Sequence, residues 1–190
     1  MGGIDLFPNA TFFIQERELA SWVKTMALSR KFRSLMGGVD PSDILRLVDL
    51  AREGRLVTVD GARENVIPHV DLHPAFDTHT AGSQYVVVRN SGDGESGDTW
   101  VLAGDLVYKH ENLHGGDEAD PFYIPVGFAT GSQTNLVMTS DEMLCRVGGD
   151  IKRVIPVHEN RLKDFFSSRQ SRFGLQVVEL SLREADVTAV

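Results

Sequence analysis

The apolar positions along the chain predict helices near its start and strands through its middle. Residues 16–28 place apolar side chains at the spacing of one helix face, and a second such segment begins at Asp40-Pro41 and ends at Gly54. Runs of β-branched, aromatic and other apolar residues predict strands at 10–14, 55–59, 69–72, 84–89, 99–103, 151–157 and 175–182. We therefore expect a mixed α/β or α+β protein.

Capping residues and glycines predict one further helix and an exposed loop. A third helix is expected after the capping sequence at residues 139–142, with glycines at 148–149 ending it. Residues 90–98 are rich in Gly, Ser and Asp and predict an exposed hairpin loop. The consecutive apolar residues 85–88 predict a strand buried on both faces, inside a layered sheet. Without repeats or a linker, residues 1–190 are expected to form a single domain.

Composition narrows the classes of function. The 190 residues are 42% hydrophobic and carry 19 Lys and Arg against 27 Asp and Glu, for a net charge of −8. Such acidity disfavours a nucleic-acid partner. A single cysteine, Cys145, excludes an internal disulfide and a paired-cysteine zinc site. The apolar runs are too short to span a bilayer and the start lacks a signal-peptide pattern, so we expect a soluble, cytoplasmic protein with no membrane partner.

Three polar residues stand at the ends of predicted strands. His79 lies in a turn just before a strand, Asp105 follows a strand through Gly104, and His158 follows another strand. Loops at strand ends collect at one edge of a sheet, where ligands bind. Imidazole and carboxylate together suit zinc, and a carboxylate can bridge two ions. Each residue alone also has an ordinary turn or surface role, so spacing by itself names no function.

The other four histidines are weaker candidates. His69 and His73 are four residues apart, but flanking prolines argue against a helix that would align them, so we expect loop or strand positions. His110 and His114 are expected on the surface near the mouth of a site, where they would be possible substrate-side groups.

Several sequence motifs together resemble a known family. They are Gly2-Gly3-Ile4-Asp5-Leu6-Phe7-Pro8-Asn9-Ala10, Gln15-Glu16-Arg17-Glu18-Leu19, His79-Thr80-Ala81-Gly82-Ser83-Gln84, Val101-Leu102-Ala103-Gly104-Asp105-Leu106-Val107-Tyr108, Glu111-Asn112-Leu113 and Ile155-Pro156-Val157-His158. In this order they resemble a metallo-β-lactamase-fold hydrolase, and within that superfamily the N-acyl-homoserine lactonase branch. The resemblance runs from residue 2 to about residue 180. It implies a partial αββα sandwich, mainly its C-terminal half plus the helices that follow the metal-binding HxHxDH loop.

The resemblance assigns roles to individual residues. His79 matches a histidine of the first zinc, Asp105 the carboxylate that bridges both zincs, and His158 the last histidine, on the second zinc. Tyr108 matches a tyrosine that points into the site, where its phenol would donate a hydrogen bond to the lactone carbonyl or its developing oxyanion. The alternative for Tyr108 is an ordinary half-buried aromatic. Thr78 stands where the family usually has glycine, which makes the turn stiffer.

The HxHxDH motif itself is absent from the chain. The resemblance therefore leaves three of seven ligands, at most two for each zinc, whereas a catalytic site needs about three. Three hypotheses follow. In the first, the chain is a zinc hydrolase that opens a lactone ring by attack of metal-bound hydroxide, and its activity is impaired because ligands are missing. In the second, it is a metal-poor, inactive remnant that serves as a binding or interaction module. In the third, its true reading frame begins upstream of Met1, so that the given chain is N-terminally truncated.

Partners follow from the same hypotheses. The expected ligand is a small lactone or ester of the N-acyl-homoserine lactone type, which would make the activity quorum-signal degradation. A homodimer could cover a sheet face that half of the fold leaves open. The polar segment 128–135 is expected to be a surface loop that caps the next helix, with the lining of a substrate cleft as the alternative.

Overall fold

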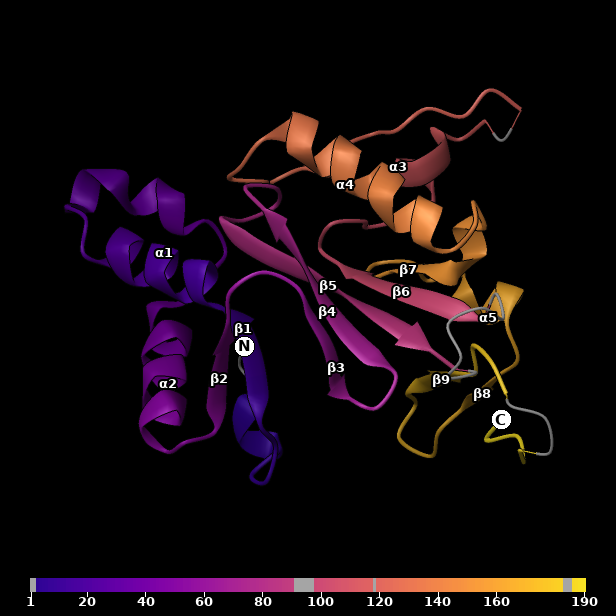
Figure 1. Cartoon of the computed structure of the whole chain (residues 1–190), viewed down its shortest axis with the longest axis horizontal. Coiled ribbons are helices and arrows are strands. Elements are labelled where there is room, and N and C mark those ends of the chain that lie inside the picture. The colour runs from indigo at the N-terminus through magenta and orange to yellow at the C-terminus, as the bar shows by residue number, and fades with distance from the viewer. Residues whose placement is uncertain (1–2, 91–97, 118, 183–185) are drawn as a thin grey trace.

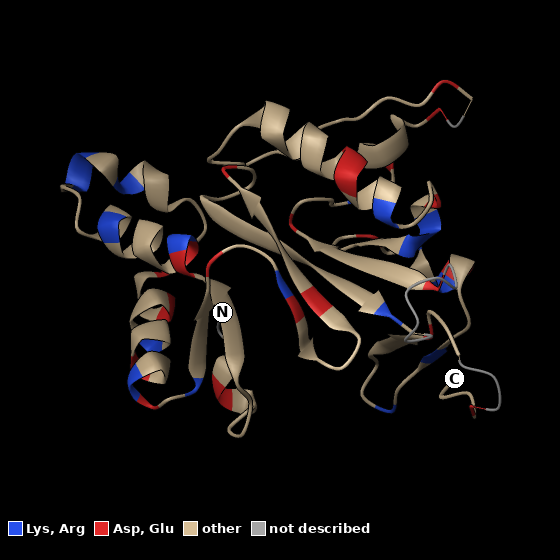
Figure 2. Ribbon diagram, viewed as in Figure 1, with Lys and Arg blue, Asp and Glu red and all other residues tan. Residues whose placement is uncertain are grey.

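The computed structural model describes residues 3–90, 98–117, 119–182 and 186–190. Its elements form an N-terminal lobe, a central sheet with its helices, and a C-terminal hairpin (Figure 1). Within the described residues, no helix is long and apolar enough to cross a bilayer. The sheet strands β5 and β6 are almost free of charged side chains, which lie mainly on the helices, loops and outer strands (Figure 2).

The N-terminal lobe comprises the elements from residue 4 to residue 59. They are η1 Ile4–Leu6, β1 Phe12–Gln15, α1 Glu16–Met26, η2 Arg30–Met36, α2 Pro41–Arg52 and β2 Leu56–Val59. Strands β1 and β2 pair in parallel, and a small core of Ile4, Ile14, Leu47 and Leu50 holds them against α2. The predicted start of α2 is confirmed, because the side chain of Asp40 accepts a hydrogen bond from the Ser42 amide.

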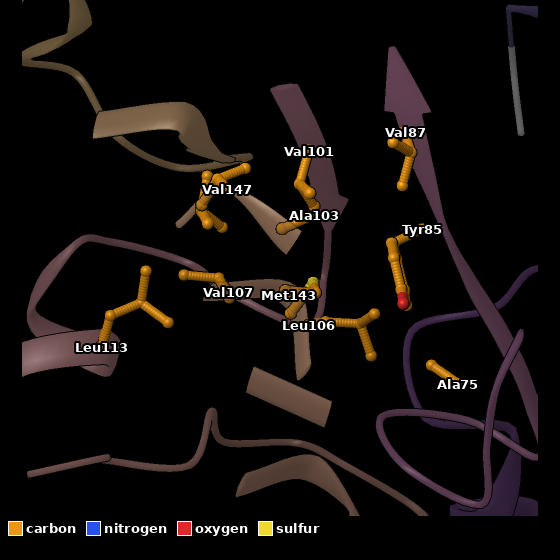
Figure 3. Packing of buried hydrophobic residues seen from close by; sticks show 11 residues of the cluster. Ala75, Tyr85, Val87, Val101, Ala103, Leu106, Val107, Leu113, Met143 and Val147 are labelled. Carbon is orange, nitrogen blue, oxygen red and sulfur yellow. The ribbon is translucent and has the colours of Figure 1, made fainter. Parts of the chain in front are cut away.

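The central sheet has the strand order β3-β4-β5-β6-β7. Its elements are β3 Arg63–Ile67, β4 Val70–Phe76, β5 Gly82–Arg89, β6 Thr99–Gly104 and β7 Val154–Pro156, with helices α3 Glu111–His114, α4 Gln133–Arg146 and η3 Ile151–Arg153. All neighbouring strands are antiparallel except β6 and β7, which run parallel. Helix α4 covers one face, where Tyr85, Val101 and Met143 are fully buried in the main core (Figures 1 and 3).

The opposite face of this sheet is less covered. Tyr85 and Val87 of β5 are buried under α4, but Val86 and Val88 on the other face are only half-buried, and Leu102 of β6 is 39% exposed. The prediction of burial on both faces is therefore wrong for this strand, because successive side chains alternate between faces that differ in cover.

The C-terminal part shields one end of that second face. It contains α5 Leu162–Phe165 and the hairpin strands β8 Ser168–Gln170 and β9 Gln176–Val178. Residues 177–181 line a shallow cavity together with Val88, Trp100 and Leu102. Phe166 packs edge-on against Trp100, with ring centroids 5.6 Å apart. The C-terminal segment thus lies on the sheet as an attached layer.

Element boundaries differ from the prediction in several places. The last strand, predicted at 175–182, is only the three-residue β9, and η2, α3, α5 and β8 were not predicted. Helix α4 begins at Gln133, six residues before the predicted capping sequence, because the Ser132 hydroxyl already accepts from the Asn135 amide. Strand β3 was not predicted, since its charged residues hide the alternation. The predicted strand at 151–157 is a 3-10 turn followed by the short β7. The predicted loop at 90–98 falls mostly on residues outside those the structure describes.

Candidate metal centre

Sheet topology brings His79, Asp105 and His158 to one edge. Strands β6 and β7 are parallel, so Asp105 and His158, which follow them, emerge side by side. Strand β5 is antiparallel to β6, and the turn before it therefore places His79 at that same edge. Gly104 has φ +55, a left-handed conformation that turns the chain sharply before Asp105. The predicted convergence at a sheet edge is observed.

The carboxylate of Asp105 lies between the two imidazoles. Nε2 of His158 is 3.5 Å from Oδ1 of Asp105, and Nε2 of His79 is 4.0 Å from Oδ2. Each imidazole therefore faces a different carboxylate oxygen. His79 is mostly covered, whereas His158 and Asp105 are more than half exposed. Such a geometry is compatible with a carboxylate shared by two ions, each with one imidazole.

Tyr108 stands beside both imidazoles. Its ring meets that of His158 edge-on at 4.9 Å between centroids and that of His79 at 6.0 Å. Its hydroxyl donates a hydrogen bond to the carbonyl oxygen of Gly127, at 3.2 Å. Partial burial, and then the charge of Asp105, raise the pKa of the Tyr108 phenol. The phenol is thus a protonated donor at neutral pH.

A carboxylate from the lobe supports the turn that carries His79. Oε2 of Glu18, on α1, accepts from the Thr80 hydroxyl at 2.8 Å and from the Gly82 amide at 2.6 Å. Oε1 of Glu18 accepts from the indole of Trp22 at 2.6 Å. A Cβ at residue 82 would lie 2.3 Å from the Glu18 nitrogen, so the close approach of helix and turn requires glycine there. We name these contacts the Glu18 bridge.

A second carboxylate joins the two loops that carry Tyr108 and His158. Glu159 is buried and accepts from the His110 amide at 3.3 Å, with Nδ1 of His110 at 3.4 Å. Arg161 donates to both of its oxygens, at 2.7 and 2.6 Å. Hydrogen bonds from Arg161, opposed by burial, lower the pKa of Glu159 to about 2. The amide of His158 donates to the Tyr108 carbonyl and closes the joint.

The expectation that His110 lies on the surface is wrong. Its side chain is 6% exposed, and Nε2 lies 3.3 Å from the Val154 carbonyl oxygen. Burial lowers the pKa of its imidazole. The ring lies between the Glu159 carboxylate, the Val154 carbonyl and the ring of Phe165, which is 5.5 Å away between centroids. Neither His110 nor His114 lines the cavity at the sheet edge.

The cavity at this edge has a volume of about 640 Å³ and lies between the sheet and the lobe. The polar residues His79, Asp105 and His158 line one side, next to Tyr108. The lobe supplies mainly apolar residues to the other side: Ile14, Trp22, Val39, Ile44 and Leu47. Sequence reasoning did not identify this wall, nor Glu18; the four-residue spacing of Glu18 and Trp22 on one helix face was the available signal.

The segment 128–135 borders the cavity and also caps a helix. Phe128 and Thr130 line the cavity, while Ser132 caps α4 as predicted. Phe128 is 96% exposed and has φ +58, an unusual conformation for a bulky residue. Gly131 packs so closely on the turn before β5 that a Cβ would lie 2.5 Å from the Thr78 carbonyl oxygen.

Thr78 and the two earlier histidines have structural roles. Thr78 is buried, and its hydroxyl donates to the Ala75 carbonyl, so the turn accommodates it in place of glycine. His69 lies in the turn between β3 and β4, with φ +68. His73 lies on β4 and stacks on Tyr85, with ring centroids 5.3 Å apart. The expectation of loop and strand positions for these histidines is confirmed.

The side chains at the edge do not complete a metal centre. Ligands to zinc lie about 2.0–2.2 Å from the ion, and catalytic zinc has about three protein ligands. His79, Asp105 and His158 offer at most two ligands to each of two ions. Among the described residues, no group of three or more His, Cys, Asp or Glu side chains is arranged to hold one ion. Nδ1 of His79 is buried without a hydrogen-bond partner there, so nothing fixes its tautomer as metal-bound histidines usually require.

Comparison with known proteins finds similar structures but no similar sequence. No family model and no curated protein matches the sequence. A structure from a study of how indirect contributions of mutations underlie optimization of new enzyme function matches with a TM-score of 0.51 and 19% identity. The match covers 86% of this chain and 52% of that one.

Two further structures cover a similar share. One is a mutant AiiA from B. thuringiensis with N-decanoyl-L-homoserine at its active site; the other is an N-acyl homoserine lactone hydrolase with the product N-hexanoyl-L-homoserine at its catalytic metal centre. Each has a TM-score of 0.48 and 18% identity, over 86% of this chain and 53% of the other. The chain spans about half the length of all three structures. The resemblance expected from the motifs is confirmed at the level of fold: the chain has part of the metallo-β-lactamase fold.

Proposed function

We propose that the chain carries part of the active site of a zinc-dependent hydrolase that opens a lactone ring, with a substrate of the N-acyl-homoserine lactone type. The observation that supports this most is the placement of Asp105 between the imidazoles of His79 and His158, beside a protonated Tyr108. Imidazole and carboxylate in this arrangement are the donors that zinc prefers. Degradation of quorum signals would be the resulting activity.

The phenol of Tyr108 would act on the substrate carbonyl. Its raised pKa keeps the proton on oxygen, so it can donate a hydrogen bond where negative charge develops. At present that hydroxyl donates to the Gly127 carbonyl. A substrate oxygen would have to replace this acceptor.

The cavity matches an amphiphilic substrate. A lactone ring would lie at the polar end, near Asp105, and an acyl chain would lie along Trp22, Ile44 and Leu47 of the lobe. Its volume of about 640 Å³ lies within the range of small-molecule sites. The substrate is therefore expected to contact both the sheet and the lobe.

Zinc would supply a polarised carbonyl and a water of lowered pKa. Because the described residues give each ion at most two ligands, we expect the chain by itself to bind zinc weakly and to hydrolyse lactones slowly. The measurements are the zinc content of dialysed protein and the hydrolysis of an N-acyl-homoserine lactone at saturating zinc. Stoichiometric zinc after dialysis would overturn the expectation of weak binding.

Matched variants test the assigned residues. His158→Ala should abolish zinc-stimulated hydrolysis, and Tyr108→Phe should lower the rate about ten- to a hundredfold without changing zinc affinity. His114→Ala, outside the cavity, is the control and should leave both unchanged. If zinc-saturated protein shows no hydrolysis above background, the enzymatic proposal is wrong.

A second candidate function is supported by the incomplete ligand set. With no three-ligand group among the described residues, the chain could be a metal-poor, inactive remnant that binds a partner. The half-exposed sheet face at Val86 and Leu102 would be its contact surface, in a homodimer or with another protein. Zinc content and sedimentation measured on one preparation discriminate the two: a stable, metal-free dimer favours the remnant, and a zinc-responsive monomer favours the enzyme.

A further inference from the structure

One segment has a charge opposite to that of the whole chain. Between Leu19 and Val39 there are four cations and not one Asp or Glu, in a chain whose net charge is −8. The cations are Lys24, Arg30, Lys31 and Arg33. We name residues 24–36 the basic tip. It comprises the end of α1, the whole of η2 and the turn between them, which lies on the side of the lobe away from the central sheet (Figures 1 and 2).

The basic tip also exposes large apolar side chains. Leu28, Phe32 and Leu35 are 40%, 42% and 48% exposed. The ammonium of Lys31 lies 5.1 Å from the centre of the Phe32 ring, so a cation and an exposed aromatic share one surface. In the part of the chain that the structure describes, none of the four cations forms an ion pair with a carboxylate. Their charge is therefore available to an external partner.

A groove lies between α1 and η2 at this tip. It has a volume of about 520 Å³, and its lining combines two guanidinium groups with apolar side chains: Thr25, Met26, Leu28, Arg30, Arg33, Met36 and Pro41. A guanidinium binds a phosphate through two parallel hydrogen bonds, and methionine adapts to irregular apolar ligands. The groove thus suits a ligand with an anionic head and a hydrocarbon body.

We propose that the basic tip docks on an anionic lipid surface. Cations in a short segment bind anionic headgroups, and the exposed Leu28, Phe32 and Leu35 can enter the boundary between headgroups and acyl chains. The remainder of the acidic chain would be repelled by such a surface, which orients the molecule with the tip toward it. An acidic protein would be attracted by the same charges, but it offers no hydrocarbon layer for the apolar side chains.

This proposal changes the expectation of no membrane partner, which was drawn from the shortness of the apolar runs. Those runs bear on a spanning segment, whereas peripheral docking needs a few side chains only. Gly37, Gly38 and Val39 follow the tip directly and line the cavity at the sheet edge. A docked tip would therefore hold that cavity near the lipid, where amphiphilic substrates concentrate. This last consequence rests on the proposed function, whereas the docking does not.

Vesicle binding tests the proposal without any assay of hydrolysis. The full chain is sedimented with vesicles of phosphatidylcholine alone and of phosphatidylcholine mixed with phosphatidylglycerol. We expect binding to the mixed vesicles only, weakened by added salt. Arg30→Glu combined with Arg33→Glu should lower the partition coefficient by at least about tenfold, since each cation near an anionic surface contributes roughly a factor of five. Phe32→Ala should lower it severalfold.

A matched control separates the tip from net charge. Arg52→Glu combined with Lys163→Glu makes the same charge change at exposed sites outside the tip and should retain vesicle binding. Equal loss in this control, equal binding to both vesicle types, or no binding to mixed vesicles would overturn the proposal. So would a concentration-dependent dimer that Arg30→Glu with Arg33→Glu dissociates, because the tip would then bind a second copy. Circular dichroism confirms that each variant is folded.

Discussion

The central sheet and the N-terminal lobe meet at the same cavity but are built differently. Under α4 the sheet packs fully buried side chains such as Tyr85, Val101 and Met143 into one continuous core. The lobe has a small core, and no residue of α1 is buried. The edge of the sheet places His79, Asp105 and His158, whereas the lobe supplies a mainly apolar wall with the carboxylates of Glu18 and Asp43. A rigid body thus holds the chemistry and a less stable part shapes the cavity.

The joint between the two regions is polar. Besides the Glu18 bridge, the amide side chain of Gln15 bonds to Gly61 and to Gln84, at 3.0 Å in each case. Such hydrogen bonds contribute less to the free energy of unfolding than a packed apolar core does, but they fix the relative position of the two regions. The comparison therefore predicts that the lobe can loosen while the sheet stays folded.

The largest effect is expected from truncating a side chain in the core of the sheet. Met143→Ala should lower the free energy of unfolding by about 3 to 5 kcal/mol, because Met143 is fully buried and leaves a cavity between α4 and the rigid sheet. Leu50→Ala, equally buried in the lobe, should cost about 2 kcal/mol, since the smaller core can relax. Urea unfolding measures both. A greater loss for Leu50→Ala would contradict the ranking of the two regions.

Glu159→Ala should cost about 3 kcal/mol, since removal of one member of a buried charged network leaves its partners unsatisfied. His110 and Arg161 lose their shared carboxylate, and the loops that carry Tyr108 and His158 lose their joint. The sheet should stay folded, with NMR shifts confined to these loops. Glu111→Ala, which removes only the exposed contact to Arg161, is the control and should cost under about 1 kcal/mol. Shifts spread through the lobe would show that the joint is not local.

Glu18→Ala should cost about 2 kcal/mol, because the Thr80 hydroxyl, the Gly82 amide and the Trp22 indole lose one acceptor. Hydrogen exchange should accelerate in α1 and leave β5 and β6 protected, which would show the lobe loosening by itself. Glu18→Gln keeps an acceptor oxygen and should recover part of the loss. Faster exchange in β5 and β6 as well would mean that the two regions unfold together.

The sequence predicted the parts of the fold whose signals are local. The Asp40-Pro41 cap identified α2, and residues placed directly after strands identified Asp105 and His158. The sheet edge that unites them was predicted because loops at strand ends collect at one edge of a sheet. The boundary of α4 and the strand β3 were missed because a Ser132 cap and charged strand residues outweigh apolar periodicity there.

Long-range contacts could not be predicted from the sequence. Glu18 and Gly82 are 64 residues apart, and His110 and Glu159 are 49 apart. His110 was expected on the surface because no residue near it in the sequence indicates a buried carboxylate partner. The apolar wall of the cavity could not be predicted for the same reason, since Trp22 and Ile44 face the site only after the lobe packs on the sheet.

The smallest effect concerns a second peripheral part, the C-terminal segment, which a carboxylate also attaches to the sheet. Asp98 accepts hydrogen bonds from Asn90, Trp100 and Ser181. Burial raises the pKa of its carboxyl, but these bonds outweigh burial and hold the pKa below its ordinary value of 3.8. Asp98→Asn should therefore cost about 1 kcal/mol at neutral pH.

The pH dependence of that cost tests its origin. A carboxyl with a lowered folded-state pKa contributes stability that is complete above pH 3.8 and is lost as the pH falls through the folded-state pKa. The gap in unfolding free energy between the wild type and Asp98→Asn should stay constant from neutral pH to about pH 5 and then shrink on further acidification. Urea unfolding across this range measures it. A gap that persists in acid would assign the effect to packing of the C-terminal segment and would contradict a contribution from the charge of Asp98.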